Sequence, residues 1–283
     1  MAISYSLIAP KNDTIVVDRT RAADPVNYTF KLKIQNQGTS TVYYKLTESS
    51  GAWSISSPSN GELGSVDSGS SAVFTITLQR ALPTTDVKET IDFTLEAYSD
   101  SGYTNLIEST TFSLTAILAD IHSWPDYVNY DFDDGTLQGW SFSSENVTSG
   151  GDATVSVVNT YSISPGGYCV RLDRASAGGV TCDFVLSKTV TLPSKSTVVV
   201  VWYLYRDSTD SDVYKAAVRV NGNVVFQTST LDISTTMWDM VGADLSDYAG
   251  QTVALDIIVR AEIATGSFYT YLDEIIIAGT DTL

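Results

Sequence analysis

Apolar and polar residues alternate in short runs along most of this chain, as they do in half-buried antiparallel strands. In the clearest run, Tyr28, Phe30, Leu32 and Ile34 fall on one face. The same two-residue period predicts further strands in the first half, over 41–47, 72–79, 90–98 and 109–116. No window of helix length shows a 3.6-residue period, so we expect an all-β protein.

The most apolar strand of the sequence is expected in the second half, over 198–206. Alternation places Val198, Val200, Trp202 and Leu204 on one face and Val199, Val201, Tyr203 and Tyr205 on the other. Further apolar segments lie over 166–172, 180–193, 215–220 and 238–255. Val, Ile, Tyr and Thr are frequent in these segments, and these residue types favour strands.

The segment 119–129 lacks this alternation and contains Pro125, so we interpret it as a linker. A chain of 283 residues is long enough for two domains with separate cores. The sequence therefore predicts two β-sandwich domains, over 1–118 and 130–283. The only histidine, His122, lies in the linker, which argues against a His-rich zinc site and against a Ser-His-Asp triad.

The charge balance excludes several classes of partner. The chain has 16 basic and 33 acidic residues, and residues 121–283 hold 8 and 20 of them, a net charge of -12. Nucleic acid is not an expected partner, because phosphate binding requires clustered Lys and Arg. No apolar run approaches the roughly 18 residues of a membrane span. The first residues lack a cationic start and a cleavage site, so no secretion signal is predicted.

Three segments of the first half carry recognisable turn and tryptophan motifs. A strand runs into the turn Asn36-Gln37-Gly38, a segment with Trp53 comes next, and a turn around Gly69 precedes a long strand. This order is similar to that of Ig-like domains appended to secreted and surface proteins. The resemblance covers residues 3–118 and implies a sandwich that acts as a spacer or an assembly module.

The second half carries more specific motifs. It opens with Asp-Phe-Asp-Asp-Gly-Thr-Leu-Gln-Gly-Trp over 131–140 and closes with Tyr-Leu-Asp-Glu-Ile-Ile-Ile over 271–277. Between them, residues 238–255 match the pattern W-x(5)-D-L-S-x-Y-x-G-Q-T-V-x-L. Together these segments resemble the galactose-binding-like jelly roll of many carbohydrate-binding modules.

That resemblance implies a structural Ca²⁺ that ties the first strand to the last. The acidic residues at the corresponding positions are Asp133, with Asp134 beside it, and Asp273. The alternative is that these carboxylates only cap turns through hydrogen bonds. The Asp-rich run 207–212 is a second candidate cation loop, although it lacks the Gly and the terminal Glu of an EF-hand.

Cys169 and Cys182 would face each other if residues 174–178 formed the turn of a hairpin. A disulfide between them would then be feasible and would stabilise the fold by about 2 to 4 kcal/mol. The alternative is that both are small buried apolar residues on neighbouring strands.

A glycan site needs aromatic rings beside polar groups on an exposed face. We expect this site on the face of the apolar strand that carries tyrosines, with contributions from neighbouring strands. The candidate ligand-binding residues are Tyr203, Tyr205, Arg219, Asp256, Arg260, Tyr269 and Tyr271. The alternative is that these tyrosines only border the core.

No arrangement typical of a catalytic centre was found, so we predict that the protein is not an enzyme. Jelly-roll glycosidases use paired carboxylates, but the E-x-D-x-x-E pattern of one large class is absent. We expect a structural or adhesion protein on a cell or virion surface, in an assembly with other subunits and with glycans as partners. The alternative is a carbohydrate-binding accessory protein of a polysaccharide-degrading system.

Overall fold

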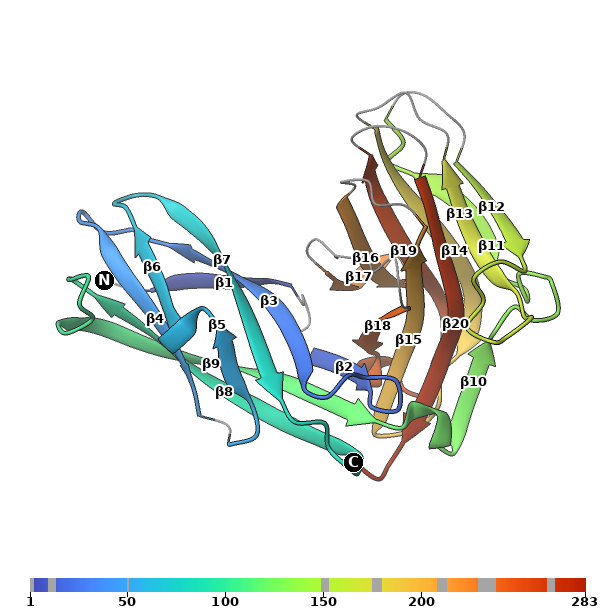
Figure 1. Ribbon diagram of the computed structural model, residues 1–283, viewed down its shortest axis with the longest axis horizontal. Helices are drawn as coiled ribbons and strands as arrows, with labels where there is room; N and C mark the ends of the chain where they lie inside the picture. Colours follow the sequence, from blue (N-terminus) through green and yellow to red (C-terminus); the bar gives the residue numbers. More distant parts are fainter. Residues whose placement is uncertain are drawn as a thin grey trace. The chain divides into compact units, whose positions relative to one another are not determined.

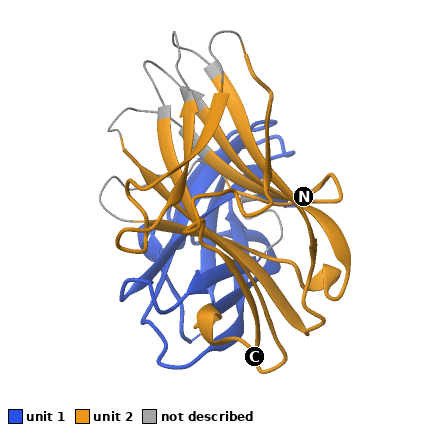
Figure 2. Ribbon diagram, turned by 90° about the vertical axis from the view of Figure 1, so that its right-hand side faces the viewer, with its two compact units in different colours: residues 1–119 blue, residues 120–283 orange. Residues whose placement is uncertain are grey.

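A computed structural model describes residues 3–9, 14–49, 51–148, 153–174, 180–207, 213–228, 238–263 and 268–283. The chain divides into two compact units, unit 1 over 1–119 and unit 2 over 120–283 (Figure 2). Extended strands and three short 3₁₀ turns make up the regular structure of the described residues, which confirms the all-β prediction. None of the helices in these ranges is long and apolar enough to cross a membrane.

Unit 1 consists of two facing sheets. Its strands are β1 (Ser4–Ala9), β2 (Thr14–Asp18), β3 (Val26–Gln35), β4 (Val42–Glu48), β5 (Ser54–Ser57), β6 (Glu62–Val66), β7 (Ser71–Arg80), β8 (Val87–Tyr98) and β9 (Leu106–Ala119). One sheet has the order β1-β3-β7-β5, and the other has the order β2-β9-β8-β4-β6. Strand β2 pairs parallel with β9 at the edge of the second sheet, and the Ig-like resemblance of this unit stays a prediction.

The core of unit 1 follows from strand alternation. Phe30, Leu32 and Ile34 of β3 are fully buried, as the pattern predicts. The ring of Phe30 meets that of Phe93 on β8 edge to face, with 5.5 Å between ring centroids. Because β3 and β8 belong to different sheets, this contact joins the two layers.

Unit 2 is a sandwich of a six-stranded and a five-stranded sheet (Figure 1). Its strands are β10 (Asp126–Tyr130), β11 (Ser141–Glu145), β12 (Ala153–Val158), β13 (Cys169–Arg174), β14 (Val180–Thr191), β15 (Thr197–Arg206), β16 (Val213–Val220), β17 (Asn223–Gln227), β18 (Asp239–Asp244), β19 (Thr252–Ile263) and β20 (Phe268–Thr280). The six-stranded sheet has the order β12-β13-β20-β15-β18, and β10 also pairs with β20. We call it the platform sheet. The opposite sheet has the order β11-β14-β19-β16-β17.

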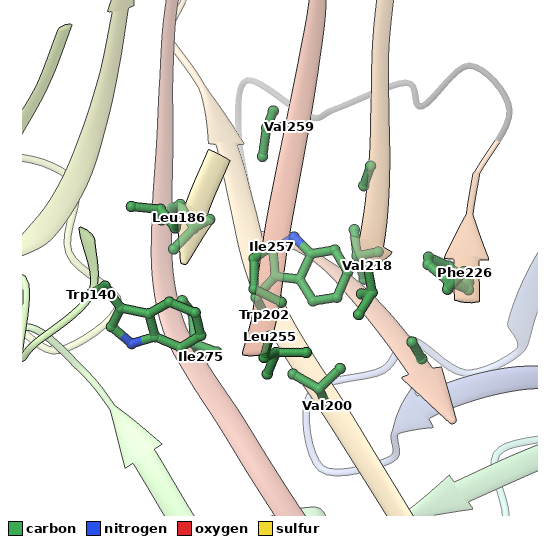
Figure 3. Close-up of a cluster of buried hydrophobic side chains, with 14 of the residues drawn as sticks. Trp140, Leu186, Val200, Trp202, Val218, Phe226, Leu255, Ile257, Val259 and Ile275 are labelled. Carbon is green, nitrogen blue, oxygen red and sulfur yellow. The ribbon is translucent and has the colours of Figure 1, made fainter. Parts of the chain in front are cut away.

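The core of unit 2 lies between these sheets. The alternation predicted for β15 is observed, because Val198, Val200, Trp202 and Leu204 all belong to the buried core cluster. Figure 3 shows Trp202 among side chains from both layers. The core also takes in Phe132 and Trp140 of the acidic opening motif, so this motif contributes packing as well as carboxylates.

The segment 119–129 differs from the expected linker. Residues 121–123 form a 3₁₀ turn, and Asp126–Tyr130 pairs antiparallel with β20 as strand β10. Pro125 immediately precedes the first paired residue, where its missing N–H removes no hydrogen bond from the ladder. The proline therefore starts a strand of unit 2 instead of interrupting a connection.

The prediction that Cys169 and Cys182 face each other across a hairpin is wrong. Strand β13 carries Cys169 and pairs with β12 and β20, whereas β14 carries Cys182 and pairs with β11 and β19. The two cysteines therefore lie in opposite sheets, and both are buried thiols outside any disulfide. Alternation within two consecutive strands cannot distinguish a hairpin from a crossing between layers. Of the predicted turn over 174–178, residues 175–178 lie outside the described residues.

Candidate functional site

Four aromatic side chains gather on the outer face of the platform sheet. We call Tyr161, Tyr205, Trp238 and Tyr271 the aromatic platform. Tyr205 on β15 and Tyr271 on β20 are direct register partners, so their side chains project from the same face. Tyr161 comes from the connection between β12 and β13, and Trp238 immediately precedes β18.

The rings contact one another closely, and one of them is open to solvent. The Tyr161 ring stacks on Tyr205 with 4.9 Å between centroids, and lies 5.0 Å from the ring of Tyr271. Trp238 extends the cluster, 5.7 Å from Tyr205. Tyr271 is only 3% exposed, whereas Tyr161 is 43% exposed. Tyr161 therefore forms the outer surface of a cluster whose lower rings support it.

A carboxylate borders the platform. The Tyr161 hydroxyl donates to Asp207 Oδ1 (2.9 Å), and the Tyr271 hydroxyl donates to Asp207 Oδ2 (3.4 Å). The hydrogen bond to Asp207 raises the pKa of Tyr161 above its usual value. Burial, with a contribution from Asp207, raises the pKa of Tyr271 to about 12. Both phenols thus keep their protons at neutral pH and can donate to the carboxylate.

Tyr269 belongs to a neighbouring polar group on the same sheet. Its register partner on β13 is Asp173, and Arg171 lies opposite Tyr271. The guanidinium of Arg171 is 4.4 Å from the Tyr269 ring centroid and forms an ion pair with Asp173 (2.7 Å). A stacked arginine and an ion pair therefore flank the platform.

Two carboxylates hold the connection that carries Tyr161. Asp273 Oδ2 accepts the backbone N–H of Ile163 (2.9 Å), and Asp133 Oδ1 accepts that of Tyr168 (2.9 Å). We call Asp133 and Asp273 the acidic clasp. Asp273 is 1% exposed, and this burial raises its pKa to about 7, with the charges of Glu274 and Asp133 adding to the rise.

The clasp and a buried thiol together fix the position of Tyr161. The thiol of Cys169 donates to the carbonyl oxygen of Thr160 (2.9 Å), on one side of Tyr161. The Asp273 contact to Ile163 lies on the other side. Burial raises the pKa of Cys169 to about 12, so this thiol stays protonated and can donate. Tyr161 is thus held between contacts to two buried side chains.

The clasp offers part of the ligand set that a hard cation requires. Asp133, Asp273 and the Ser162 hydroxyl, which donates to Asp273 (3.4 Å), converge on one connection. The exposed carboxylate of Asp133 and the buried carboxyl group of Asp273 are oxygen ligands of the kind that Ca²⁺ takes, with backbone carbonyls and water completing such a set. Within the described ranges, no group of three or more His, Cys, Asp or Glu residues could hold a metal ion.

The other predicted cation ligands are Asp134 and the Asp-rich run 207–212. Asp134 Oδ1 accepts both the backbone N–H (2.8 Å) and the hydroxyl (2.7 Å) of Thr136, so it caps its own turn, as the alternative interpretation expected. In the run 207–212, only Asp207 lies within the described residues, and it borders the platform.

The predicted glycan set is divided between two faces, which corrects the sequence interpretation. Arg219 and Asp256 project from β16 and β19 of the opposite sheet, and so does Arg260. Arg219 pairs with Asp256 (2.9 Å) and with Glu145 (2.7 Å). The neighbours of β15 are β18 and β20, not β16 and β19, because the chain crosses between the two layers at each step from β13 to β16.

The ion pairs of the opposite sheet surround a small pocket of about 130 Å³. Arg260 holds Asp183 through two hydrogen bonds (2.5 and 2.6 Å), and Asp183 is almost fully buried. Each arginine already has a carboxylate partner, and no aromatic residue lines the pocket. This pocket therefore lacks the aromatic stacking surface of a glycan site.

Tyr203 projects from the predicted face of β15, but its side chain is not exposed to solvent as predicted. It is the register partner of Asp273 and lies only 1% exposed, so it packs beside the acidic clasp. Sequence reasoning missed Tyr161, Asp207 and Trp238 as site residues. Trp238 opens the motif over 238–255, and Asp207 begins the Asp-rich run, so both had a signal. Tyr161 lies in a polar, turn-rich segment that carries no such signal.

Comparison with solved structures finds carbohydrate-binding modules. A structure from a study of carbohydrate-binding modules of the β-sandwich superfamily is 16% identical, covers 97% of both chains and has a TM-score of 0.41. A xylan-binding domain from Paenibacillus barcinonensis is 16% identical over 55% of this chain and 95% of its own, with a TM-score of 0.38. A Caldicellulosiruptor saccharolyticus module in complex with mannohexaose is 16% identical over 56% and 99%, with a TM-score of 0.41.

No protein-family model matches the sequence, and no curated protein matches it either.

Proposed function

We propose that unit 2 binds a carbohydrate without catalysing its breakdown, and that the aromatic platform is the binding surface. The observation that carries this proposal is the exposed Tyr161 ring, supported from below by Tyr205 and Tyr271. Binding sites combine apolar or aromatic surface with a few placed polar groups. The C–H face of a sugar would stack on Tyr161, and its hydroxyls would donate to Asp207.

The surroundings of the carboxylates support a non-catalytic role. Glycosidases need two carboxyl groups about 5 to 10 Å apart on either side of the scissile bond. In unit 2, Glu145 and Asp183 are held by arginines, and Asp133 and Asp273 hold backbone N–H groups. These four carboxylates have structural partners, so they maintain the fold.

We place this binding activity outside the cell, in the attachment of a virion or cell surface to glycans. Unit 1 would serve as a spacer that carries the binding unit and joins other structural subunits. An accessory role in a polysaccharide-degrading system would use the same binding surface. The two settings differ in the partner of the chain: other structural subunits in the first, a polysaccharide-degrading enzyme in the second.

Replacing Tyr161 by Ala should weaken glycan binding by about tenfold or more, because it removes the exposed stacking surface. Calorimetry with xylo-, manno-, cello- and chito-hexaose measures this loss. The Tyr161→Phe variant keeps the ring and should retain most of the affinity. Gln227→Ala, in the pocket of the opposite sheet, should change nothing. Loss of binding in Gln227→Ala but not in Tyr161→Ala would place the ligand on the wrong face for this proposal.

We further propose that the acidic clasp binds a structural Ca²⁺ through Asp133 and Asp273. The ion would place a positive charge beside the buried carboxyl group of Asp273, and would hold the first and last segments of unit 2 together. Asp134 is not part of this proposal, because its carboxylate caps a turn.

Adding Ca²⁺ after treatment with EDTA should raise the melting temperature of unit 2. At a concentration of 100 times Kd, the expected stabilisation is about 2.7 kcal/mol. Calorimetry of the original protein and of two variants tests this. The rise in melting temperature with Ca²⁺ should disappear in Asp133→Asn and persist in the matched Asp134→Asn. Equal melting temperatures with Ca²⁺ and with EDTA in the original protein would rule the ion out.

A further inference from the structure

Asp207 gives the platform a charge that nothing in the described structure neutralises. It directly follows β15 and is exposed to solvent. Its carboxylate accepts hydrogen bonds from the hydroxyls of Tyr161 and Tyr271, and both are neutral donors. In the described part of the chain, no lysine or arginine forms an ion pair with it.

The cation beside the platform already has a partner. Arg171 forms an ion pair with Asp173 (2.7 Å) and stacks over the ring of Tyr269. Arg171, Asp173 and Asp207 together therefore carry one net negative charge. The wider surroundings have the same sign, because residues 121–283 have a net charge of -12. A ligand that approaches this face meets a negative potential.

This combination of groups suits an ammonium ion. The face of an aromatic ring attracts a cation, and a nearby carboxylate adds a charge-assisted hydrogen bond. A neutral sugar gains only stacking and ordinary hydrogen bonds at the same place. A uronic acid or a sulfated sugar would be repelled by Asp207.

We propose that the ligand of the aromatic platform is an amino sugar with a free, protonated amine, which binds between the Asp207 carboxylate and the Tyr161 ring. The inference rests on the proposed function, since it concerns the same surface. It adds the chemical class of the ligand: a glycan rich in unacetylated hexosamine, in preference to neutral or acidic glycans.

The test compares two hexasaccharides that share one backbone and differ in charge, and adds an acidic hexasaccharide as a third ligand. At pH 6 and low salt, the β-1,4-linked glucosamine hexamer should bind about tenfold more tightly than the N-acetylglucosamine hexamer. A galacturonic acid hexamer should bind more weakly than both. The preference for the amine should shrink as the salt concentration rises, because exposed charges are screened. Calorimetry of the whole chain gives all three affinities.

Two variants of equal net charge distinguish the effect of Asp207 on binding from the effect of the overall negative charge of the chain. Asp207→Asn should bind the two glucosamine-based hexamers equally and should still bind both. Asp134→Asn removes one charge from a turn that is not part of the platform and should keep the full preference. An equal loss of preference in both variants would overturn the proposal, since bulk charge would then explain the binding.

The remaining outcomes distinguish this inference from the function on which it rests. If the original protein binds the neutral and the amino hexamers equally, or the galacturonic acid hexamer most tightly, the amino-sugar inference is wrong and carbohydrate binding stands. If the original protein binds none of the amino, neutral and acidic hexamers, the proposed function fails, and the inference fails with it.

Discussion

Replacing Gly61 by Ala is expected to destabilise unit 1 by about 3 kcal/mol or more. Gly61 ends a 3₁₀ turn with φ of +68°, and a Cβ atom there would lie 1.8 Å from the carbonyl oxygen of Leu46. Leu46 belongs to β4, which is paired on both sides with β6 and β8. The backbone of a paired strand cannot move away, so the overlap adds to the cost of the left-handed conformation.

Gly69 provides a matched control for this prediction. Its φ is +69°, but a Cβ atom added there would have no heavy atom within 4 Å. Gly69→Ala should therefore cost only about 1 to 2 kcal/mol, the usual penalty of a left-handed residue with a side chain. Urea unfolding followed by hydrogen exchange in peptides from residues 1–119 measures both variants. Equal costs would show that the contact with Leu46 is not what requires glycine.

Truncation of Trp202 to Ala should destabilise unit 2 by about 3 to 5 kcal/mol. The side chain is fully buried in the core, where its ring meets Phe226 edge to face at 6.4 Å. Its indole N–H is buried and has no hydrogen-bond partner among the described residues. The loss is thus one of packing and apolar burial, with no hydrogen bond given up.

The same unpaired N–H sets the expectation for a milder variant. Trp202→Phe keeps an aromatic ring and removes the unsatisfied donor, so it should cost clearly less than the alanine variant. Trp238→Ala truncates a partly buried indole at the platform and should affect glycan binding more than stability. Urea unfolding with hydrogen exchange in peptides from 120–283 compares the three. If Trp202→Ala were no more costly than Trp238→Ala, Trp202 would not be central to the core.

The orientation of side chains within a strand could be predicted from the sequence. In β15, Trp202 points into the core and Tyr205 points away from it, as the two-residue period requires. This succeeds because side-chain direction in a strand depends only on local backbone geometry. For the same reason, the alternation of β3 identified Phe30, Leu32 and Ile34 as its buried residues.

Strand neighbours could not be predicted in this way. The sequence interpretation placed Arg219, Asp256 and Arg260 beside Tyr205, and it paired the strands of the two cysteines. Both expectations failed, because the chain crosses between the two sheets at each step from β13 to β16. A local pattern carries no information on whether the chain turns back in the same layer or crosses to the other.

The candidate site depends on this long-range arrangement. Tyr161, Tyr205 and Tyr271 come from three segments separated by 44 and 66 positions, and only the pairing of β13, β15 and β20 brings them together. Asp133 and Asp273, predicted from the resemblance to lie near one another, do hold the same connection. Local alternation thus determined the strands and their buried faces, since these depend on neighbouring residues. Tertiary pairing decided which exposed groups share a surface, since contacts between distant segments form only when the whole sandwich packs.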